Sequence, residues 1–212
     1  RGGWAKLEFS KTEHLTSEGY FTYLKEFKGG HSLNAVAGYS YFEKNGENFN
    51  AENYDFGVEG LKYWDLGAGS YLTDGKAAMG SGKNITERLF ALYARANYSY
   101  NDKYMVSATI RHEGSSKFAA ENRWGNFWAL SGGWRVSAEE FMKEFDWVSD
   151  LKVRFGYGVT GNNDFDASYM ANTLSRDQYW MLPSGSWAYV YGPSSNVNPY
   201  LGWEEKKEWN IG

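Results

Sequence analysis

The side chains most able to do chemistry in this chain are three histidines, and no cysteine accompanies them. His14, His31 and His112 lie far apart, on different predicted reversals or strand ends. A metal centre or a nucleophile–base pair needs its side chains close together, and this spacing does not provide that. The acidic run at 139–144 belongs to a predicted helical turn, whose N-terminus acids stabilise. The sequence therefore predicts no catalytic residue, no metal site and no cofactor, and we expect a protein that is not an enzyme.

Residues 162–166 match only the first positions of a calcium-binding loop. The oxygen-bearing side chains of this segment have the spacing that opens such a loop. Ala167, however, occupies the position of the required glycine, and Thr173 occupies that of the bidentate glutamate. We therefore interpret the segment as a polar turn.

Five basic side chains fall on one face of the predicted strands, opposite the apolar residues: Arg95, Arg111, Arg135, Lys152 and Arg154. One interpretation is an electropositive surface that attracts an anionic ligand. The other is that these cations pair with carboxylates of neighbouring segments. We favour pairing, because charges on an enclosed surface are normally paired.

Flat aromatic side chains gather in the polar stretch at 161–202. Four of them are candidate substrate-binding residues: Tyr179, Trp180, Trp187 and Tyr189. Aromatic faces can stack on sugar rings or pack against a peptide. They can equally pack between loops or anchor a partner protein. The sequence leaves both interpretations open.

Two long strands position the first of the basic residues. Between residues 89 and 112 nearly every second side chain is apolar, and those between are mostly polar. A period of two over this length indicates two β-strands, each with one apolar and one polar face. Both strands keep their even-numbered residues on one face only if Tyr100 pairs with Tyr104 across a three-residue loop at 101–103.

The length of this hairpin and the position of its tyrosines favour a membrane wall. Each strand has about the 9–11 residues that a tilted transmembrane strand needs. Tyr98, Tyr100 and Tyr104 gather beside the turn, where an aromatic girdle would meet a bilayer surface. The predicted fold class is therefore all-β, an antiparallel transmembrane β-barrel.

The rest of the chain alternates between short turns and long loops. Further strands are expected at 4–11, 21–27, 32–43, 124–136, 151–160 and 203–212. A turn is expected near 14–18, and a capping-box pattern at 137–140 predicts one or two helical turns. The segments 44–88 and 161–202 lack a sustained period and are expected to be long loops. Turns near 29–30, 101–103 and 137–149 share one end of the strands, and loops at 44–88, 113–123 and 161–202 share the other, which is typical of outer-membrane barrels.

Composition fits a wall wetted by lipid on one face and by water on the other. Aromatic residues make up 19% of the 212 residues, although the mean hydropathy is only −0.63. No apolar run approaches the roughly 18 residues of a spanning helix. The net charge of −4 gives no indication of nucleic-acid binding.

Six short blocks carry a resemblance to a known family. They are residues 111–118 (RHEGSSKF), 122–125 (NRWG), 131–135 (SGGWR), 157–162 (YGVTGN), 198–204 (NPYLGWE) and 208–212 (EWNIG). In this order and spacing the chain resembles the SusC/RagA-type TonB-dependent transporters of the Bacteroidota outer membrane. It departs from the family pattern at Glu113 and Tyr200, where the family usually has an aspartate and an asparagine-like residue.

The resemblance implies a 22-stranded barrel, filled by an N-terminal plug, that TonB opens to import large nutrients such as oligosaccharides or peptides. It also implies a SusD-like surface lipoprotein as a partner and a multi-pass location in the outer membrane of a Gram-negative cell, in contact with its lipid. About eight strands fall in this chain, so we expect residues 1–212 to be part of the barrel domain, with the plug and the remaining strands outside it. The five basic residues would then face the lumen, where carboxylates of the plug could pair with them.

A rival of another class is a soluble β-sandwich, such as a carbohydrate-binding module, which the aromatics would also suit. In a sandwich, the leucines, valines and tyrosines of the apolar stripe would be sealed in a dry two-layer core. In a barrel they would face hydrocarbon.

Overall fold

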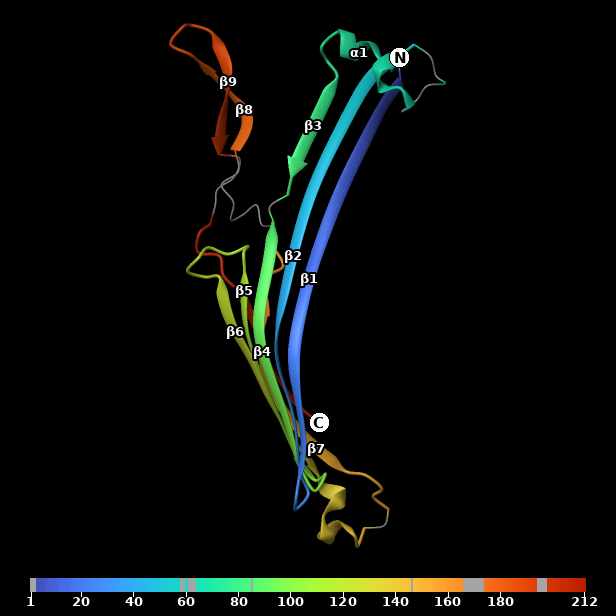
Figure 1. Ribbon diagram of the computed structural model, residues 1–212, viewed down its shortest axis with the longest axis vertical. Coiled ribbons are helices and arrows are strands. Elements are labelled where there is room, and N and C mark those ends of the chain that lie inside the picture. The colour runs from blue at the N-terminus through green and yellow to red at the C-terminus, as the bar shows by residue number, and fades with distance from the viewer. Residues whose placement is uncertain are drawn as a thin grey trace. The chain divides into compact units, whose positions relative to one another are not determined.

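The computed structural model describes residues 3–57, 60, 64–84, 86–145, 147–165, 174–193 and 198–212. The chain divides into two units, Arg1–Leu15 with Glu43–Thr86, and Thr16–Phe42 with Glu87–Gly212. Ten strands are described, and eight of them form one sheet (Figure 1). Their bounds are β1 Gly3–Phe27, β2 His31–Phe56, β3 Ala78–Lys83, β4 Glu87–Tyr100, β5 Tyr104–Ser115, β6 Trp124–Arg135, β7 Lys152–Asn162, β8 Leu174–Met181, β9 Trp187–Pro193 and β10 Glu204–Ile211.

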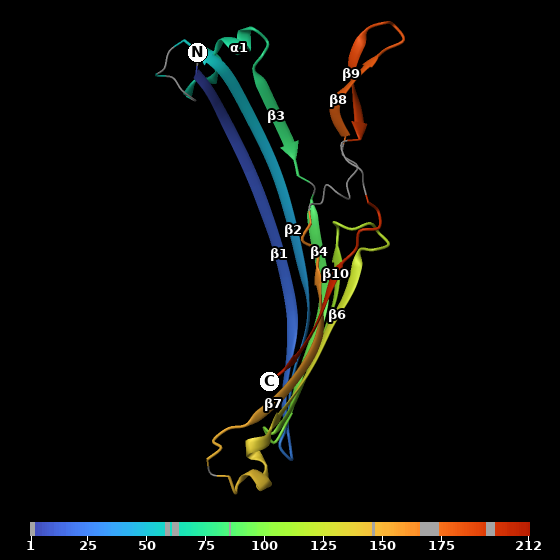
Figure 2. The ribbon, with the colours of Figure 1, turned by 180° about the vertical axis from the view of Figure 1, so that it is seen from behind.

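The eight-stranded sheet is a run of neighbouring strands. The order in the sheet is β1-β2-β4-β5-β6-β7-β10, with β3 paired to β2, and the four pairs from β4 through β10 are antiparallel (Figure 2). In the β4–β5 hairpin Tyr100 pairs with Tyr104, so the predicted register is confirmed. Asn101 and Asp102 have φ of 50° and 55°, a left-handed conformation that these two residue types tolerate.

The period of two extends across the sheet as rows of like side chains. One row runs Ala96, Ala108, Leu130, Tyr157 and Trp209, from β4 to β10. Large apolar side chains on this face are exposed: Ile110 is 54% exposed, and Leu92 and Leu130 are each 50% exposed. Among the described residues no second sheet covers this face, so the apolar stripe is not sealed in a two-layer core. The sandwich interpretation is wrong, and the wall of an antiparallel barrel is what the sheet resembles.

The first two strands are longer than predicted. Residues 4–11 and 21–27 belong to one strand, β1, and the predicted turn near 14–18 is wrong. Residues 11–18 contain a single apolar side chain, Leu15, so the hydrophobic alternation is lost there. A paired strand nevertheless satisfies its backbone N–H and C=O groups through its neighbour, whatever its side chains.

The predicted loop at 44–88 is largely ordered structure, so that prediction is also wrong. Strand β2 continues to Phe56, and β3 pairs with it from Glu47 with Lys83 to Glu52 with Ala78. Between them lie the 3-10 helix η2, Leu66–Ala68, and the single turn α1, Ser70–Thr73. Asn53, only 2% exposed, donates through Nδ2 to the carbonyls of Leu66 at 2.7 Å and Gly69 at 2.8 Å, which holds this connection together.

The connection between β6 and β7 contains the predicted helical turns, as two 3-10 helices rather than a capped α-helix. They are η3, Val136–Ala138, and η4, Glu140–Met142. Ser137 does not cap either helix; its hydroxyl donates to Asp150 Oδ1 at 2.9 Å. No described helix is long and apolar enough to cross a membrane.

The stretch at 161–202, also predicted as a loop, contains a small hairpin of its own. Strands β8 and β9 form a separate two-stranded sheet in which Tyr179 pairs with Tyr189. The predicted strands at 151–160 and 203–212 are confirmed as β7 and β10.

Candidate functional site

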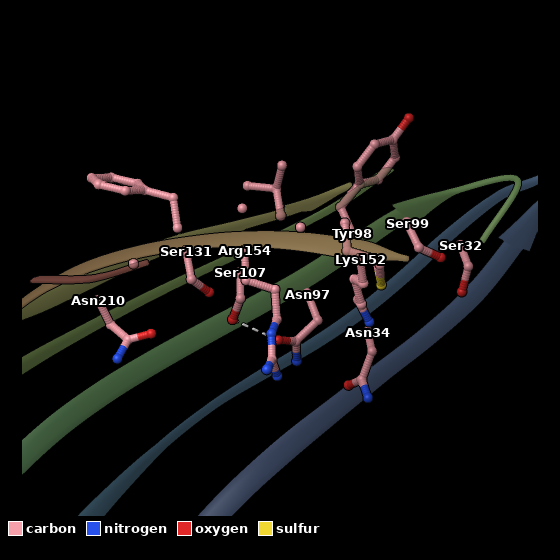
Figure 3. A pocket seen from close by; sticks show the side chains of 16 residues that line it. Ser32, Asn34, Asn97, Tyr98, Ser99, Ser107, Ser131, Lys152, Arg154 and Asn210 are labelled. Carbon is pink, nitrogen blue, oxygen red and sulfur yellow. Dashed lines mark hydrogen bonds between the residues drawn. The ribbon is translucent and has the colours of Figure 1, made fainter. Parts of the chain in front are cut away.

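A hollow of about 630 Å³ lies against the polar face of the larger unit. Its polar lining comes from β2, β4, β5, β6, β7 and β10: Ser32, Asn34, Asn97, Ser99, Ser107, Ser131, Lys152, Arg154 and Asn210. Figure 3 shows Asn97, Ser107 and Arg154 on one side of the strands and Tyr98 on the other. Gly133 and Gly156 add no side chain to this face, which leaves the space open.

The floor of the hollow is a single row of small polar positions. Asn97 pairs with Ser107, Ser107 with Ser131, Ser131 with Gly156, and Gly156 with Asn210. Within the row, the Ser107 hydroxyl donates to Asn97 Oδ1 at 2.7 Å. The row offers hydroxyl and amide groups, which can bond either a peptide backbone or sugar hydroxyls.

Two cations border this row. Arg154 pairs across the sheet with Gly133, and Lys152 pairs with Arg135. Among the described residues, no carboxylate forms an ion pair with Lys152 or Arg154. Their charges therefore remain available to a ligand or to a segment that packs on this face.

Two other predicted basic residues have carboxylate partners, one in the same strand and one in the connection between β6 and β7. Arg111 donates through Nε and Nη2 to the two oxygens of Glu113 at 2.8 and 2.9 Å, and its Nη2 lies 3.4 Å from Ser40 Oγ. Arg135 Nε lies 3.0 Å from Asp150 Oδ1. The hydroxyl of Ser137 and the guanidinium of Arg135 together lower the pKa of Asp150 from its ordinary value. Arg95 lies on the same face, opposite Thr109, and no ion pair joins it to a described carboxylate.

The four predicted aromatic residues all lie on the β8–β9 hairpin, and three of them form one cluster. Tyr179 contacts Tyr189 edge to face with ring centroids 4.1 Å apart, and it stacks on Trp187 at 6.3 Å. Trp180 pairs with Ala188 and belongs to the opposite face. All four rings are more than half exposed, so each could meet a ligand or a partner.

Two of the blocks that carry the family resemblance, 111–118 and 198–204, meet in a cluster with two further aromatic residues. The sequence did not mark this cluster as a site. Phe118 lies 5.1 Å from Phe165 and 5.2 Å from Trp203, and Trp203 lies 5.1 Å from Phe127, all between ring centroids. Lys117 Nζ donates to the Phe165 carbonyl at 3.0 Å. We call these five residues the latch, because they join three segments that are distant in the sequence.

Glycine is required beside the latch. A Cβ on Gly161 would lie 2.0 Å from Phe127 Cζ, and one on Gly125 would lie 2.4 Å from the same atom. Phe127 is only 6% exposed, so its ring has little room to move. The glycines of two of the blocks therefore have a packing reason, which could have been suspected only once those blocks were known to meet.

A second arrangement that the sequence did not reveal surrounds Glu139. Its carboxylate accepts hydrogen bonds from Tyr104 Oη at 2.6 Å and Trp134 Nε1 at 3.1 Å, and from Lys103 Nζ at 3.3 Å. These bonds, that of Tyr104 foremost, lower the pKa of Glu139 from its ordinary value. Tyr104 and Trp134 are paired neighbours on the apolar face, at the turn end of the sheet.

Tyr98, Tyr100 and Tyr104 gather at that end with His31 and Trp134. The Tyr98 hydroxyl lies 2.6 Å from His31 Nδ1, and the His31 ring lies 4.5 Å from that of Tyr100. We call these five residues the aromatic belt. Amphipathic rings of this kind collect where a bilayer meets water.

The remaining titratable candidates were His112 and the segment at 162–166. His112 bonds Asn126 Oδ1 through Nδ1 at 2.8 Å and stacks on Trp124. Within the part of the chain that the structure describes, no group of three His, Cys, Asp or Glu side chains could hold an ion. The Asp164 N–H donates to Asn162 Oδ1 at 3.0 Å, as in a polar turn; Asp166, the last residue of the supposed calcium loop, lies outside the described residues.

Comparisons with known proteins agree with this architecture. Residues 4–212 match the family described as TonB dependent receptor-like, beta-barrel. The TonB-dependent receptor P39 of Formosa agariphila is 34% identical over 206 residues, which is 92% of this chain and 18% of that receptor. The TonB-dependent receptor SusC of Bacteroides thetaiotaomicron is 36% identical over 126 residues, covering 58% of this chain and 13% of SusC.

A solved structure of the RagAB peptide importer in its closed-closed state has the same fold. It superposes with a TM-score of 0.75 at 23% identity, over 98% of this chain and 22% of the solved chain. The chain thus spans about a fifth of the length of that structure and less than a fifth of SusC and P39. The family match over nearly the whole chain, together with the open antiparallel wall, leads to one conclusion: the chain belongs to the TonB-dependent receptor-like β-barrel family and is of the SusC/RagA type.

Proposed function

We propose that this chain is part of the wall of an outer-membrane barrel that imports large nutrients with energy delivered by TonB. The observation that carries the proposal is the two-faced sheet. Its exposed apolar face ends in the aromatic belt, and its other face holds the polar row and two cations. A wall of this kind separates hydrocarbon from an aqueous lumen.

In this proposal residues 1–212 form one segment of a 22-stranded barrel domain. The remaining strands and a plug domain belong to other parts of the protein. Two considerations support it. The relatives are several times longer than this chain. In lipid, moreover, the outer strands β1 and β10 need partners, because unpaired backbone groups are not tolerated in hydrocarbon.

A SusD-like surface lipoprotein is the proposed partner, and the β8–β9 hairpin is the proposed point of contact with it or with cargo. Tyr179, Trp187 and Tyr189 present a ready-made aromatic face. Rigid exposed rings provide much contact area for little loss of conformational entropy. A related structure is named a peptide importer, which supports peptides as cargo; the aromatic rings suit oligosaccharides equally.

Uptake by cells tests the proposal. A strain that lacks the whole gene should fail to accumulate its cargo from a panel of labelled peptides and oligosaccharides, and the intact gene should restore accumulation. Accumulation should stop when a protonophore collapses the inner-membrane gradient, because TonB depends on it. Accumulation that persists without the gene, or despite the protonophore, would contradict the proposal.

The same assay separates import from an outer-membrane enzyme. An importer delivers intact cargo, whereas a hydrolase would release fragments outside the cell. Products in the medium that appear only when the gene is present would favour the enzyme.

A further inference from the structure

The connection between β6 and β7 exposes three large aromatic side chains within seven residues. Phe141 is 56% exposed, Phe145 45% and Trp147 84%. A turn that faces bulk water gains nothing from such residues, since each keeps a large apolar surface hydrated. Clustered exposed apolar groups mark a surface that something covers.

Glu139 fixes where this connection lies. It precedes Phe141 by two residues, and its carboxylate accepts from Tyr104 and Trp134, both on the apolar face. Val136, buried to 8% exposure, and the bond from the Ser137 N–H to the Leu151 carbonyl close the base of the connection. At Glu139 the connection therefore lies at the turn end of the apolar face, at the level of the aromatic belt.

This part of the apolar face is not an edge that further strands could cover. Strands β5 and β6, which carry Tyr104 and Trp134, are flanked by β4 and β7. A strand added to complete the barrel joins a strand that has a free edge, and β5 and β6 each already have a neighbour on both sides. In a membrane barrel, lipid covers this part of the apolar face. The same lipid would contact the exposed aromatic side chains of the connection, which lies beside the aromatic belt.

The charge of the connection indicates which lipid surface it suits. Residues 136–151 contain five carboxylates, Glu139, Glu140, Glu144, Asp146 and Asp150, against the single cation Lys143. Lys143 pairs with Glu140 at 2.7 Å. An acidic segment is repelled by anionic headgroups and is compatible with zwitterionic ones that carry an ammonium group.

We propose that residues 136–150 are an interfacial anchor: Phe141, Phe145 and Trp147 insert into the headgroup–acyl boundary of a zwitterionic leaflet at the turn end of the barrel. Glu139, a residue of the anchor, accepts hydrogen bonds from Tyr104 and Trp134 of the aromatic belt. Amphipathic segments bind bilayer surfaces by this combination of apolar insertion and headgroup contact. The anchor rests on the barrel wall of the proposed function and is independent of cargo.

Spin-label accessibility in bilayers tests the anchor. Single cysteines replace Phe141, Phe145 or Trp147 in a cysteine-free form of the whole protein, reconstituted in vesicles of phosphatidylethanolamine and phosphatidylcholine. Oxygen concentrates in the bilayer and a nickel chelate in water, so their ratio of collision rates reports depth. Glu144→Cys, an exposed polar position in the same segment, is the matched control, and Ile110→Cys, in the middle of the apolar face, marks hydrocarbon.

The oxygen-to-nickel ratio at the three aromatic positions is expected to be severalfold higher than the ratio at Glu144. It should remain lower than the ratio at Ile110. Ratios equal to that of Glu144 would overturn the anchor while leaving the barrel wall intact. Shielding of all three labels from both reagents would also overturn it, because a protein surface would then cover the segment. A water-like ratio at Ile110 would instead overturn the wall on which the proposed function rests.

Discussion

At the scale of single residues, the polar face combines a neutral floor with cations of two kinds. Arg111 and Arg135 are held by Glu113 and Asp150, whereas Lys152 and Arg154 have no described carboxylate partner. A paired guanidinium contributes little field beyond its own ion pair. Lys152 and Arg154 therefore dominate what an approaching ligand meets at the hollow.

Reversing these two charges should change uptake selectively. In the double variant Lys152→Glu, Arg154→Glu, uptake of acidic peptides is expected to fall about tenfold, the lower end of what a focusing field contributes. Uptake of neutral peptides should stay unchanged. Initial rates with labelled peptides of equal length check this.

The conservative variant Arg154→Lys is the control and should behave as the parent does. Equal losses for acidic and neutral peptides would show that the two cations hold the barrel or its plug together rather than attract cargo.

Glu139 gives the belt a dependence on pH. Its folded pKa lies below the ordinary 4.5, so the ionised carboxylate stabilises the fold above that value. As the pH falls below 4.5 and through the folded pKa, this contribution is lost. The temperature at which the barrel loses its SDS-resistant form should therefore drop between pH 5 and strongly acid conditions, more in the parent than in Glu139→Gln.

At neutral pH the Glu139→Gln variant should unfold at a lower temperature than the parent, because an amide oxygen accepts more weakly than a carboxylate. Identical unfolding temperatures for the two proteins at both pH values would rule out the role given to Glu139.

At the scale of elements, the latch joins the ends of β5 and β6 to the segments that follow β7 and precede β10. Its four rings and Lys117 come from segments that are distant in the sequence, and the bond from Trp203 Nε1 to the Arg123 carbonyl, 80 residues away, joins two of the same segments. Such a cluster holds the loops in place only if no neighbouring side chain overlaps with its rings. Gly161 is the position where that space is smallest.

Gly161→Ala should therefore destabilise the barrel by about 1–3 kcal/mol, the usual effect of overpacking. Gly132→Ala is the matched control, because the nearest atom to its Cβ would be 4.0 Å away. Denaturant unfolding in detergent, followed by tryptophan fluorescence, measures both. A Gly161→Ala protein as stable as the control would mean that Phe127 moves freely, against its burial.

Elements were predictable where hydrophobic alternation was strong. The β4–β5 register followed from parity alone, since a slip of one residue would have moved every apolar side chain to the polar face. The full length of β1 and the pairing of β3 were missed, because residues 11–18 and 44–56 are mostly polar and their few apolar side chains do not keep to one face. Backbone pairing needs no side-chain pattern, so the sequence carried no signal there.

The candidate sites were predictable to the same extent. Parity places Lys152 and Arg154 on the polar face, and the pair Arg111 and Glu113 could be foreseen, since residues two apart in a strand share a face. Glu139 and the latch depend on contacts between separate segments, such as Tyr104 with Glu139, which no local pattern encodes.

At the scale of the whole molecule, the chain is a stretch of wall whose two faces meet different solvents. The family match assigns it to a barrel, and the register carries the alternation from β4 to β10 without interruption. Import, the plug, the lipoprotein partner and the anchor all presuppose that the apolar rows face hydrocarbon and the row from Asn97 to Asn210 faces the lumen.

An accessibility scan along β5 tests this most directly. Spin labels at the consecutive positions 105–110 of the whole protein in liposomes are measured with oxygen and with a nickel chelate. Positions 106, 108 and 110 should favour oxygen, and 105, 107 and 109 should favour nickel or be shielded from both, a period of two with opposite phases. Labels that show no alternation, or alternate in the reverse phase, would contradict the account.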